Sequence, residues 1–372
     1  MKKRCARRNA VPGFGQKGRI TLYDLTTLLL HAAEKKTSDV HLTVGLPPVL
    51  RIDGALRDYG DTPLTDEDLF DAARQLADKG QLEELGATGE VDFAVTFASQ
   101  IRMRCNIYRQ QRHTAMALRL LPMTIPTAEE LRLPQILVQQ AEKPRGLVIV
   151  TGPTGSGKSS TLAALLDHIN RTERRHIITL ENPIEYVHPR IRSVINQREI
   201  GADTANFASG LRAALRQDPD VILVGEMRDL ETISTAVTAA ETGHLVFGTL
   251  HTKSAAATVD RIVDVFPPAQ QEQVRIQLAE VLECVISQTL LPRTAGGRVA
   301  AFEILVGNAA VRNLIRQNKS YQLISVMQTG RDQGMLLLDD ALAELVRSGE
   351  ISALDAAEQA TDPETFRAAL FG

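Results

Sequence analysis

The spacing of apolar residues changes along the chain and predicts two domains of different class. Over residues 21–36 apolar side chains fall on one helical face, at Leu22, Leu25, Leu28, Leu29, Ala32 and Ala33. They then alternate with polar residues in SDVHLTV and PVLRIDG, and return to helical spacing over residues 65–86. Three further strand-like segments follow: EVDFAVTF, IRMRCNIYRQ and HTAMALRLL. The pattern predicts a small α+β domain over residues 20–121.

A proline-rich stretch separates this domain from the rest of the chain. Residues 122–134 contain three prolines, which block both helices and sheet ladders, so we expect a linker there. From Arg145 onwards strands and helices alternate, with strands predicted at LVIVTG, HIITLEN, SVINQRE, DVILVGE, LVFGTLHT and VAAFEILVG. Fully apolar runs such as VILV are typical of strands covered on both faces. Residues 135–372 are therefore predicted to be an α/β domain with a mainly parallel sheet, with short helices beyond Gly307.

The composition argues against several classes of protein. A net charge of −3, with both signs mixed along the chain, does not favour a nucleic-acid partner. The three cysteines form no CxxC pair, which argues against a structural zinc site and favours a reducing compartment. No apolar run approaches the ~18 residues of a membrane helix.

Residues 1–19 carry seven Lys and Arg and no acid but lack a signal peptide's apolar core, so we expect a flexible basic extension. A weak contact with anionic lipid is the alternative.

A glycine-rich loop after the first α/β strand matches the phosphate-binding pattern G-x-x-x-x-G-K-[ST]. Its glycines allow backbone N–H groups to turn towards phosphates, and the following helix adds a favourable partial charge. Lys158 is expected to reach the β- and γ-phosphates, and the Ser159 hydroxyl to bind Mg²⁺. The nucleotide-binding candidates are Gly152, Pro153, Thr154, Gly155, Ser156, Gly157, Lys158, Ser159 and Ser160.

Carboxylates and histidines follow the next strands. DPDVILVGEMRD delivers Glu226 to the carboxyl end of a strand, where it can orient or deprotonate the attacking water or hold the water shell of Mg²⁺. Glu181 and Glu185 lie in ITLENPIEYVH, and either could face the metal, a solvated loop being the alternative. His251 follows a strand and is placed to sense the γ-phosphate. His244, at the other end of that strand, is a helper or a structural residue.

Three arginines, Arg104, Arg112 and Arg119, are placed in the final strands of the N-terminal domain. An arginine brought to a phosphate from another subunit stabilises transition-state charge. A solvated strand face is the alternative.

These motifs together resemble the secretion-type hexameric motor ATPases, most closely the retraction ATPases of type IV pili, the PilT type. The resemblance runs from about Ile20 to the C-terminus. It rests on SDVHLTVGLPPVLRIDG, GPTGSGKSSTLAALLDHIN, ENPIEYVH, DPDVILVGEMRDLETISTAVTAAETGHLVFGTLHT and RIVDVFP. Its most discriminating part is AVRNLIRQNK, residues 310–319, followed by VMQTGRDQGM.

The resemblance implies a PAS-like N-terminal domain joined to a RecA-like ATPase domain, assembled as a homohexamer that hydrolyses ATP with Mg²⁺. It implies that Glu226 is the Walker B glutamate, a metal-side carboxylate and the general base. Glu181 and Glu185 become an acidic box beside the metal, with Glu185 the first choice, and His251 becomes the His-box residue.

By the same resemblance, Arg104 and Arg119 become candidates for action across a subunit boundary, with Arg112 third. The implied function is disassembly of a type IV pilus, by a cytoplasmic motor that reaches the inner membrane only through a platform protein.

The alternatives are a pilus-assembly or secretion ATPase, a non-hydrolysing regulatory subunit and a nucleic-acid translocase. Against the first, the chain has no four-cysteine zinc insertion; against the second, it retains Lys158, Ser159 and Glu226. The charge balance and the lack of a basic, aromatic-rich groove argue against the third.

The sequence departs from the family pattern at four places. Asn182 stands in ENP where the family has EDP, Ser160 replaces a threonine, GMLLLDDAL replaces a GMQT-like stretch, and the basic extension has no counterpart.

Within AVRNLIRQNK, helical spacing predicts that Val311, Leu314 and Ile315 pack on the ATPase core. Arg312, Asn313 and Arg316 then fall on other faces, available for force transmission or partner docking.

Overall fold

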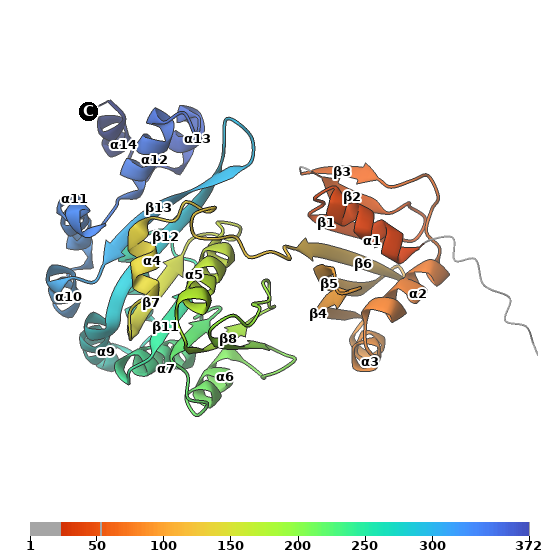
Figure 1. Cartoon of the computed structure of the whole chain (residues 1–372), viewed down its shortest axis with the longest axis horizontal. Coiled ribbons are helices and arrows are strands. Elements are labelled where there is room, and N and C mark those ends of the chain that lie inside the picture. The colour runs from red at the N-terminus through yellow and green to blue at the C-terminus, as the bar shows by residue number, and fades with distance from the viewer. Residues whose placement is uncertain (1–23, 53, 372) are drawn as a thin grey trace, which may run out of the picture. The chain divides into compact units, whose positions relative to one another are not determined.

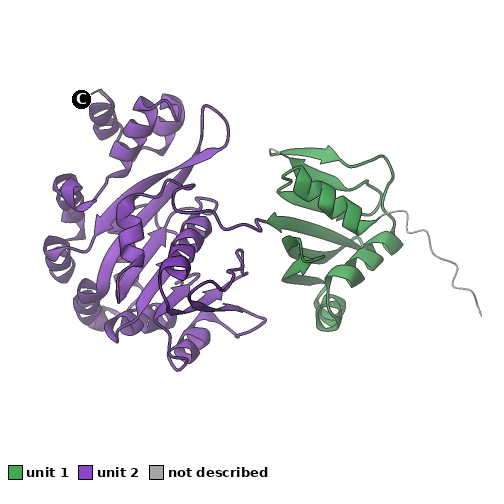
Figure 2. Cartoon of the chain, in the orientation of Figure 1, with its two compact units in different colours: residues 1–121 green, residues 122–372 purple. Residues whose placement is uncertain are grey.

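The structure is a computed structural model that describes residues 24–52 and 54–371. The chain divides into two compact units, residues 1–121 and 122–372 (Figure 2). The predicted basic extension, Cys5 and Leu22 lie outside the described residues. Within the described ranges, no helix combines the length and the apolar character that crossing a bilayer requires.

The first unit is an antiparallel sheet with the strand order β3-β2-β1-β6-β5-β4. Its strands are β1 (Asp39–Thr43), β2 (Val49–Ile52), β3 (Ala55–Asp58), β4 (Glu90–Phe97), β5 (Ile101–Gln110) and β6 (His113–Leu121). Its helices are α1 (Leu25–Glu34), α2 (Asp66–Leu76) and α3 (Lys79–Thr88). The α+β class predicted from the sequence is confirmed. In β5, buried Ile101, Met103, Cys105 and Ile107 alternate with more exposed residues, so one face of the sheet carries the core and the other is polar.

The second unit is built on a seven-stranded sheet with the order β13-β12-β7-β11-β10-β8-β9 (Figure 1). All neighbouring pairs are parallel except β12 with β13, which confirms the mainly parallel sheet. The strands are β7 (Gly146–Thr151), β8 (His176–Glu181), β9 (Val194–Glu199), β10 (Val221–Val224), β11 (Leu245–Thr249), β12 (Leu282–Pro292) and β13 (Arg298–Val306). Strand β12 is absent from the elements that the sequence predicts.

Helices cover both faces of this sheet. They are α4 (Gln135–Ala141), α5 (Lys158–Thr172), α6 (Phe207–Ala214), α7 (Leu230–Glu241), α8 (Ala255–Asp264), α9 (Pro268–Val281), α10 (Ala309–Arg316), α11 (Leu323–Thr329), α12 (Leu338–Arg347), α13 (Ala353–Gln359) and α14 (Pro363–Phe371). The core on one face joins α4 and α5 to the sheet, and the core on the other joins α7, α8, α9 and α10 to it. Because side chains alternate along a strand, Val148 and Ile149 of β7 contribute to opposite cores. The short helices predicted beyond Gly307 are confirmed.

Candidate phosphate-binding and catalytic site

The glycine-rich loop connects β7 to α5 at the carboxyl end of the parallel strands. Gly152, Gly155 and Gly157 have φ values of 136°, 81° and 89°, a region that other residues rarely adopt. Helix α5 begins at Lys158 with no side-chain N-cap bond. The N–H groups of its first turn therefore have no side-chain cap and are available to an anion.

Lys158 is the cation of this loop. Its Nζ donates to the carbonyl oxygens of Gly152 and Pro153, at 2.7 and 2.9 Å, so the side chain folds back over the loop. Burial lowers the pKa of Lys158, while the nearby carboxylates of Glu226 and Glu185 raise it in opposition. Both carboxylates therefore lie within electrostatic reach of the ammonium group that would meet the phosphates.

The serines of the loop have different surroundings. Ser156 is buried, and its hydroxyl has no hydrogen-bond partner among the residues that the structure describes. Ser159 is exposed in the first turn of α5, where a hydroxyl can meet a phosphate-bound cation. The Ser160 hydroxyl lies 2.7 Å from the Tyr186 hydroxyl, and this bond ties α5 to the ENPIEYVH segment rather than directing Ser160 at the loop. The residues present fit a phosphate group: positive-φ glycines, an uncapped helix and one ammonium group.

Glu226 lies just beyond β10 and is largely buried. His251, which follows β11, approaches it with 2.8 Å between His251 Nε2 and Glu226 Oε1. Arg228 pairs with the same carboxylate oxygen. Adjacent parallel strands β10 and β11 bring Glu226 and His251 together. Arg228 is the partner that the sequence reasoning missed, although the motif GEMRD contains it.

Glu181 and Glu185 differ sharply in environment. Glu181 ends β8, and its Oε1 accepts from Thr179 Oγ1 at 2.6 Å and from Gln197 Nε2 at 3.1 Å. Burial raises the pKa of Glu181, partly offset by these two hydrogen bonds. Glu185 is only half-buried and acts on the charge of Lys158. Of the two, only Glu185 contributes to the pKa of Lys158, which makes it the better candidate for a carboxylate beside the loop.

Hydroxyl groups connect the end of β7 to the segment after His251. The Thr151 hydroxyl lies 2.8 Å from the Thr252 carbonyl oxygen and 2.7 Å from its hydroxyl, which lies 2.6 Å from the Thr258 hydroxyl. The Ser287 hydroxyl donates to the Lys253 carbonyl oxygen at 3.0 Å. These bonds hold the His251 segment beside the strand that feeds the glycine loop.

His244 lies at the opposite end of β11. Its Nδ1 is 2.9 Å from the Ala239 carbonyl oxygen, at the end of α7. Of the two roles considered for it, the geometry favours the structural one.

The three candidate arginines of the first unit do not form one group. Arg104 and Arg119 are directly opposite each other on β5 and β6. Arg104 Nε lies 3.4 Å from Asp92 Oδ1, and Arg119 Nε donates to Asp39 Oδ1 at 2.9 Å. Arg112 was expected in a strand, but this is wrong: it lies in the β5–β6 turn with a φ of 71°. It is about 20 Å or more along the hairpin from Arg104, at a rise of ~3.3 Å per residue.

The AVRNLIRQNK segment forms α10, and its apolar positions pack as predicted. Val311, Leu314 and Ile315 are buried, while Asn313 and Arg316 are exposed. The expectation for Arg312 is wrong. Its guanidinium group donates to the carbonyl oxygens of Gly307 and Ala279, each at 2.8 Å, to that of Glu280, and to Glu283 Oε1 at 2.8 Å. Arg312 therefore caps the C-terminal end of α9.

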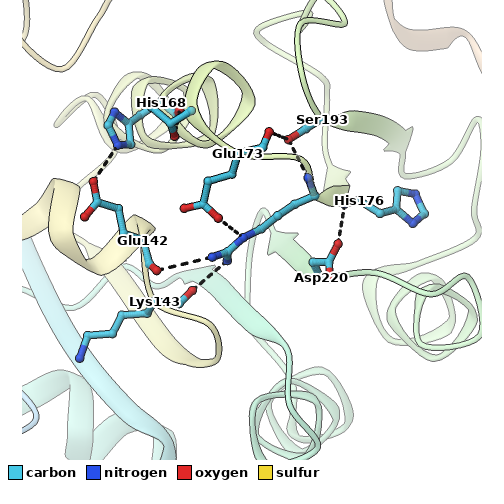
Figure 3. Close-up of polar contacts among 9 residues, drawn as sticks. Glu142, Lys143, His168, Glu173, His176, Ser193 and Asp220 are labelled. Carbon is cyan, nitrogen blue, oxygen red and sulfur yellow. Dashed lines mark hydrogen bonds and ion pairs between the residues drawn. The ribbon is translucent and has the colours of Figure 1, made fainter.

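A second polar group lies at the amino ends of the strands, away from the glycine loop. Arg175 donates from Nη1 to the Lys143 carbonyl oxygen at 2.8 Å and pairs with Glu173. His168 Nε2 lies 3.2 Å from Glu142 Oε1, and the His176 N–H donates to Asp220 Oδ2 at 2.7 Å (Figure 3). These contacts join α4, α5, β8 and β10 to one another, so the group has a structural role.

The chain matches the family described as Type II/IV secretion system protein over residues 19–356. It is 49% identical to the Type IV pilus retractation ATPase PilT of Pseudomonas aeruginosa over 343 residues, which cover 92% of this chain and all of that protein. It is 48% identical to the Twitching motility protein of Neisseria gonorrhoeae, over 92% of both chains.

The fold also matches a solved structure. A crystal structure of the pilus retraction motor PilT with bound ADP has a TM-score of 0.88 and 46% identity, and the match covers 93% of this chain and 99% of that one. The similarity therefore spans both units and the candidate site.

Proposed function

Because the chain belongs to the type II/IV secretion system protein family, and within it to the retraction ATPases of type IV pili, we propose that it is a Mg²⁺-dependent, ATP-hydrolysing motor that withdraws pilin from the pilus base. The observation that carries the enzymatic part is that Glu226 follows β10 on the sheet edge where β7 enters the glycine loop, and that its charge and that of Glu185 act on Lys158. A site that only binds nucleotide needs the loop and the lysine; hydrolysis also needs a carboxylate beside them.

Each residue has a role that follows from its chemistry. Backbone N–H groups of the loop and Lys158 bind the phosphates, and Lys158 leaves its two carbonyl partners to do so. Mg²⁺, held by the Ser159 hydroxyl and a carboxylate among Glu226 and Glu185, would neutralise charge on the β- and γ-phosphates. Glu226 accepts a proton from the attacking water while the water oxygen bonds to the γ-phosphorus and the bond to the bridging oxygen of ADP breaks.

His251 orients this base. Its Nε2 lies 2.8 Å from Glu226 Oε1, so the second oxygen of the carboxylate is left for the water. The hydroxyl contacts of Thr252 tie the His251 segment to β7. Loss of the γ-phosphate can therefore change the position of that segment relative to β7.

We also propose that the protein acts as a homohexamer, in which Arg104 and Arg119 of one subunit stabilise transition-state charge in another. Their position side by side on a polar sheet face supports this, because both side chains are exposed, Arg104 beside Asp92 and Arg119 beside Asp39. The motor works at the cytoplasmic face of the inner membrane, docked on a platform protein.

The test uses the purified full chain and cells that lack the protein. Wild type should hydrolyse ATP, and Lys158→Ala should lose nucleotide binding because the loop loses its cation. In cells, deletion should leave pili that extend but do not retract, and wild type but not Lys158→Ala should restore retraction. Normal retraction in the deletion strain would refute the proposed role in retraction.

A further inference from the structure

We propose that Gln288 is a positioning residue for the glycine loop; the proposal rests on nucleotide binding by that loop. Gln288 lies on β12 and is 3% exposed. It follows Ser287, whose register partner is Thr151, the last residue of β7. Gln288 therefore lies where the chain leaves the sheet to form the loop, although it is far from the loop in sequence.

Both the first and the last glycine of the loop lie against Gln288. A Cβ atom at Gly152 would be 2.2 Å from the Gln288 carbonyl oxygen, and a Cβ at Gly157 would be 2.8 Å from Gln288 Nε2. Real Cβ atoms do not approach so closely, so any side chain at Gly152 would push the loop off β12. Gly152 is therefore required for contact with the Gln288 backbone as well as for its φ value, and a side chain at Gly157 would displace the Gln288 amide.

The Gln288 amide also holds the first turn of α5. Its Oε1 accepts from Thr161 Oγ1 at 2.8 Å, and Thr161 is 1% exposed. The Thr161 N–H donates to the Gly157 carbonyl oxygen at 3.0 Å, which closes that turn. With its oxygen bound to Thr161, the amide turns its NH₂ group towards Gly157. One buried side chain thus sets the position of the loop relative to α5.

This arrangement predicts an effect on phosphate affinity without contact with the nucleotide. The N–H groups of the loop bind phosphate only if they converge. Gln288 positions both ends of the loop, Gly152 through its backbone carbonyl group and Gly157 through its side-chain amide. A glutamate at this position keeps the shape but places a carboxylate oxygen beside Gly157. Its negative charge, in a buried site, would oppose the phosphates.

The experiment measures the Kd of the purified full chain for ADP and for ATP across pH 5.5–8.5, together with kcat and KM. Gln288→Ala should raise Kd about tenfold, equivalent to about 1.4 kcal/mol. Gln288→Glu should raise Kd more than tenfold at pH 8, and the loss should shrink as pH falls and the carboxyl becomes protonated. Gln140→Glu is the matched control, because Gln140 is a 2%-exposed glutamine on α4. It should lower the melting temperature but leave Kd within about twofold of wild type and independent of pH.

Several results would overturn the proposal. One is a wild-type Kd in folded Gln288→Glu, and another is an equal loss of affinity in Gln140→Glu. If the Gln288 variants do not fold, Thr161→Val removes the same hydrogen bond at nearly constant volume. It should raise Kd severalfold, and an unchanged Kd there also overturns the proposal. A wild-type chain that binds no nucleotide would instead refute the proposed function.

Discussion

Replacement of Arg312 by alanine tests whether the end of α9 depends on the AVRNLIRQNK segment. The last carbonyl groups of a helix have no partner within it, and Arg312 bonds to two of them, those of Ala279 and Glu280. It also bonds to the Gly307 carbonyl oxygen and to Glu283. A cation at this position complements the helix dipole as well.

The expected loss of stability follows from these contacts. Each carbonyl bond contributes about 1 kcal/mol net, and the bond to the Glu283 carboxylate somewhat more. Water can replace part of the lost hydrogen bonding, because the Arg312 side chain is 22% exposed. Glu283 also retains its ion pair with Lys143, at 3.1 Å. We therefore expect Arg312→Ala to lower the free energy of unfolding by about 3 kcal/mol. For a domain of this size that corresponds to roughly 6–12 °C in melting temperature.

The assay is thermal unfolding of the full chain without nucleotide, since bound ligand would mask the change. Arg316→Ala is the matched control: Arg316 is exposed on the same helix, and its loss should change stability by less than about 0.5 kcal/mol. Arg312→Lys should recover only part of the loss, because an ammonium group cannot bond four oxygens in this geometry. A melting temperature of Arg312→Ala within 2 °C of wild type would refute the reasoning.

Four further predictions concern the site and its output. Asn313→Ala with Arg316→Ala should leave ATPase activity near normal but stop retraction in cells, because both side chains are exposed and neither lies at the loop; lost ATPase activity would make α10 part of the enzymatic machinery. Glu226→Gln should bind nucleotide while kcat falls roughly 10²-fold or more, the scale of general-base loss; normal turnover would remove Glu226 from the mechanism. Rings that mix Arg104→Ala with Glu226→Gln subunits should regain activity that neither variant has alone; rings shown to be mixed but inactive would contradict action across subunits. Burial raises the pKa of Glu181, so its favourable contribution to folding is complete below the ordinary pKa of 4.5 and is lost as pH rises through the raised value. Glu181→Gln should therefore raise the melting temperature at pH 8, with the gain narrowing towards pH 4.5; a gain that is the same at both pH values would contradict this.

Local patterns in the sequence were enough to predict most of the elements and the centre of the site. Strands β5 and β6 have the predicted bounds, because alternation of apolar and polar residues is a property of the strand itself. The spacing of its residues predicts the glycine loop. The positions of Glu226 and His251 after strands are predicted by the rule that the carboxyl ends of parallel strands lie at one edge of the sheet.

Contacts between distant segments were decided only by the tertiary structure. Strand β12 escapes prediction because α9 passes directly into it at Leu282, with no glycine or proline to mark the change. Without β12, nothing in the sequence relates Gln288 to the glycine loop. Arg312 was misassigned for a similar reason: helical spacing indicates which side of α10 an arginine occupies, but not that the end of α9 lies there. Periodicity is set by neighbouring residues, whereas these contacts depend on which strands pair and which helices pack.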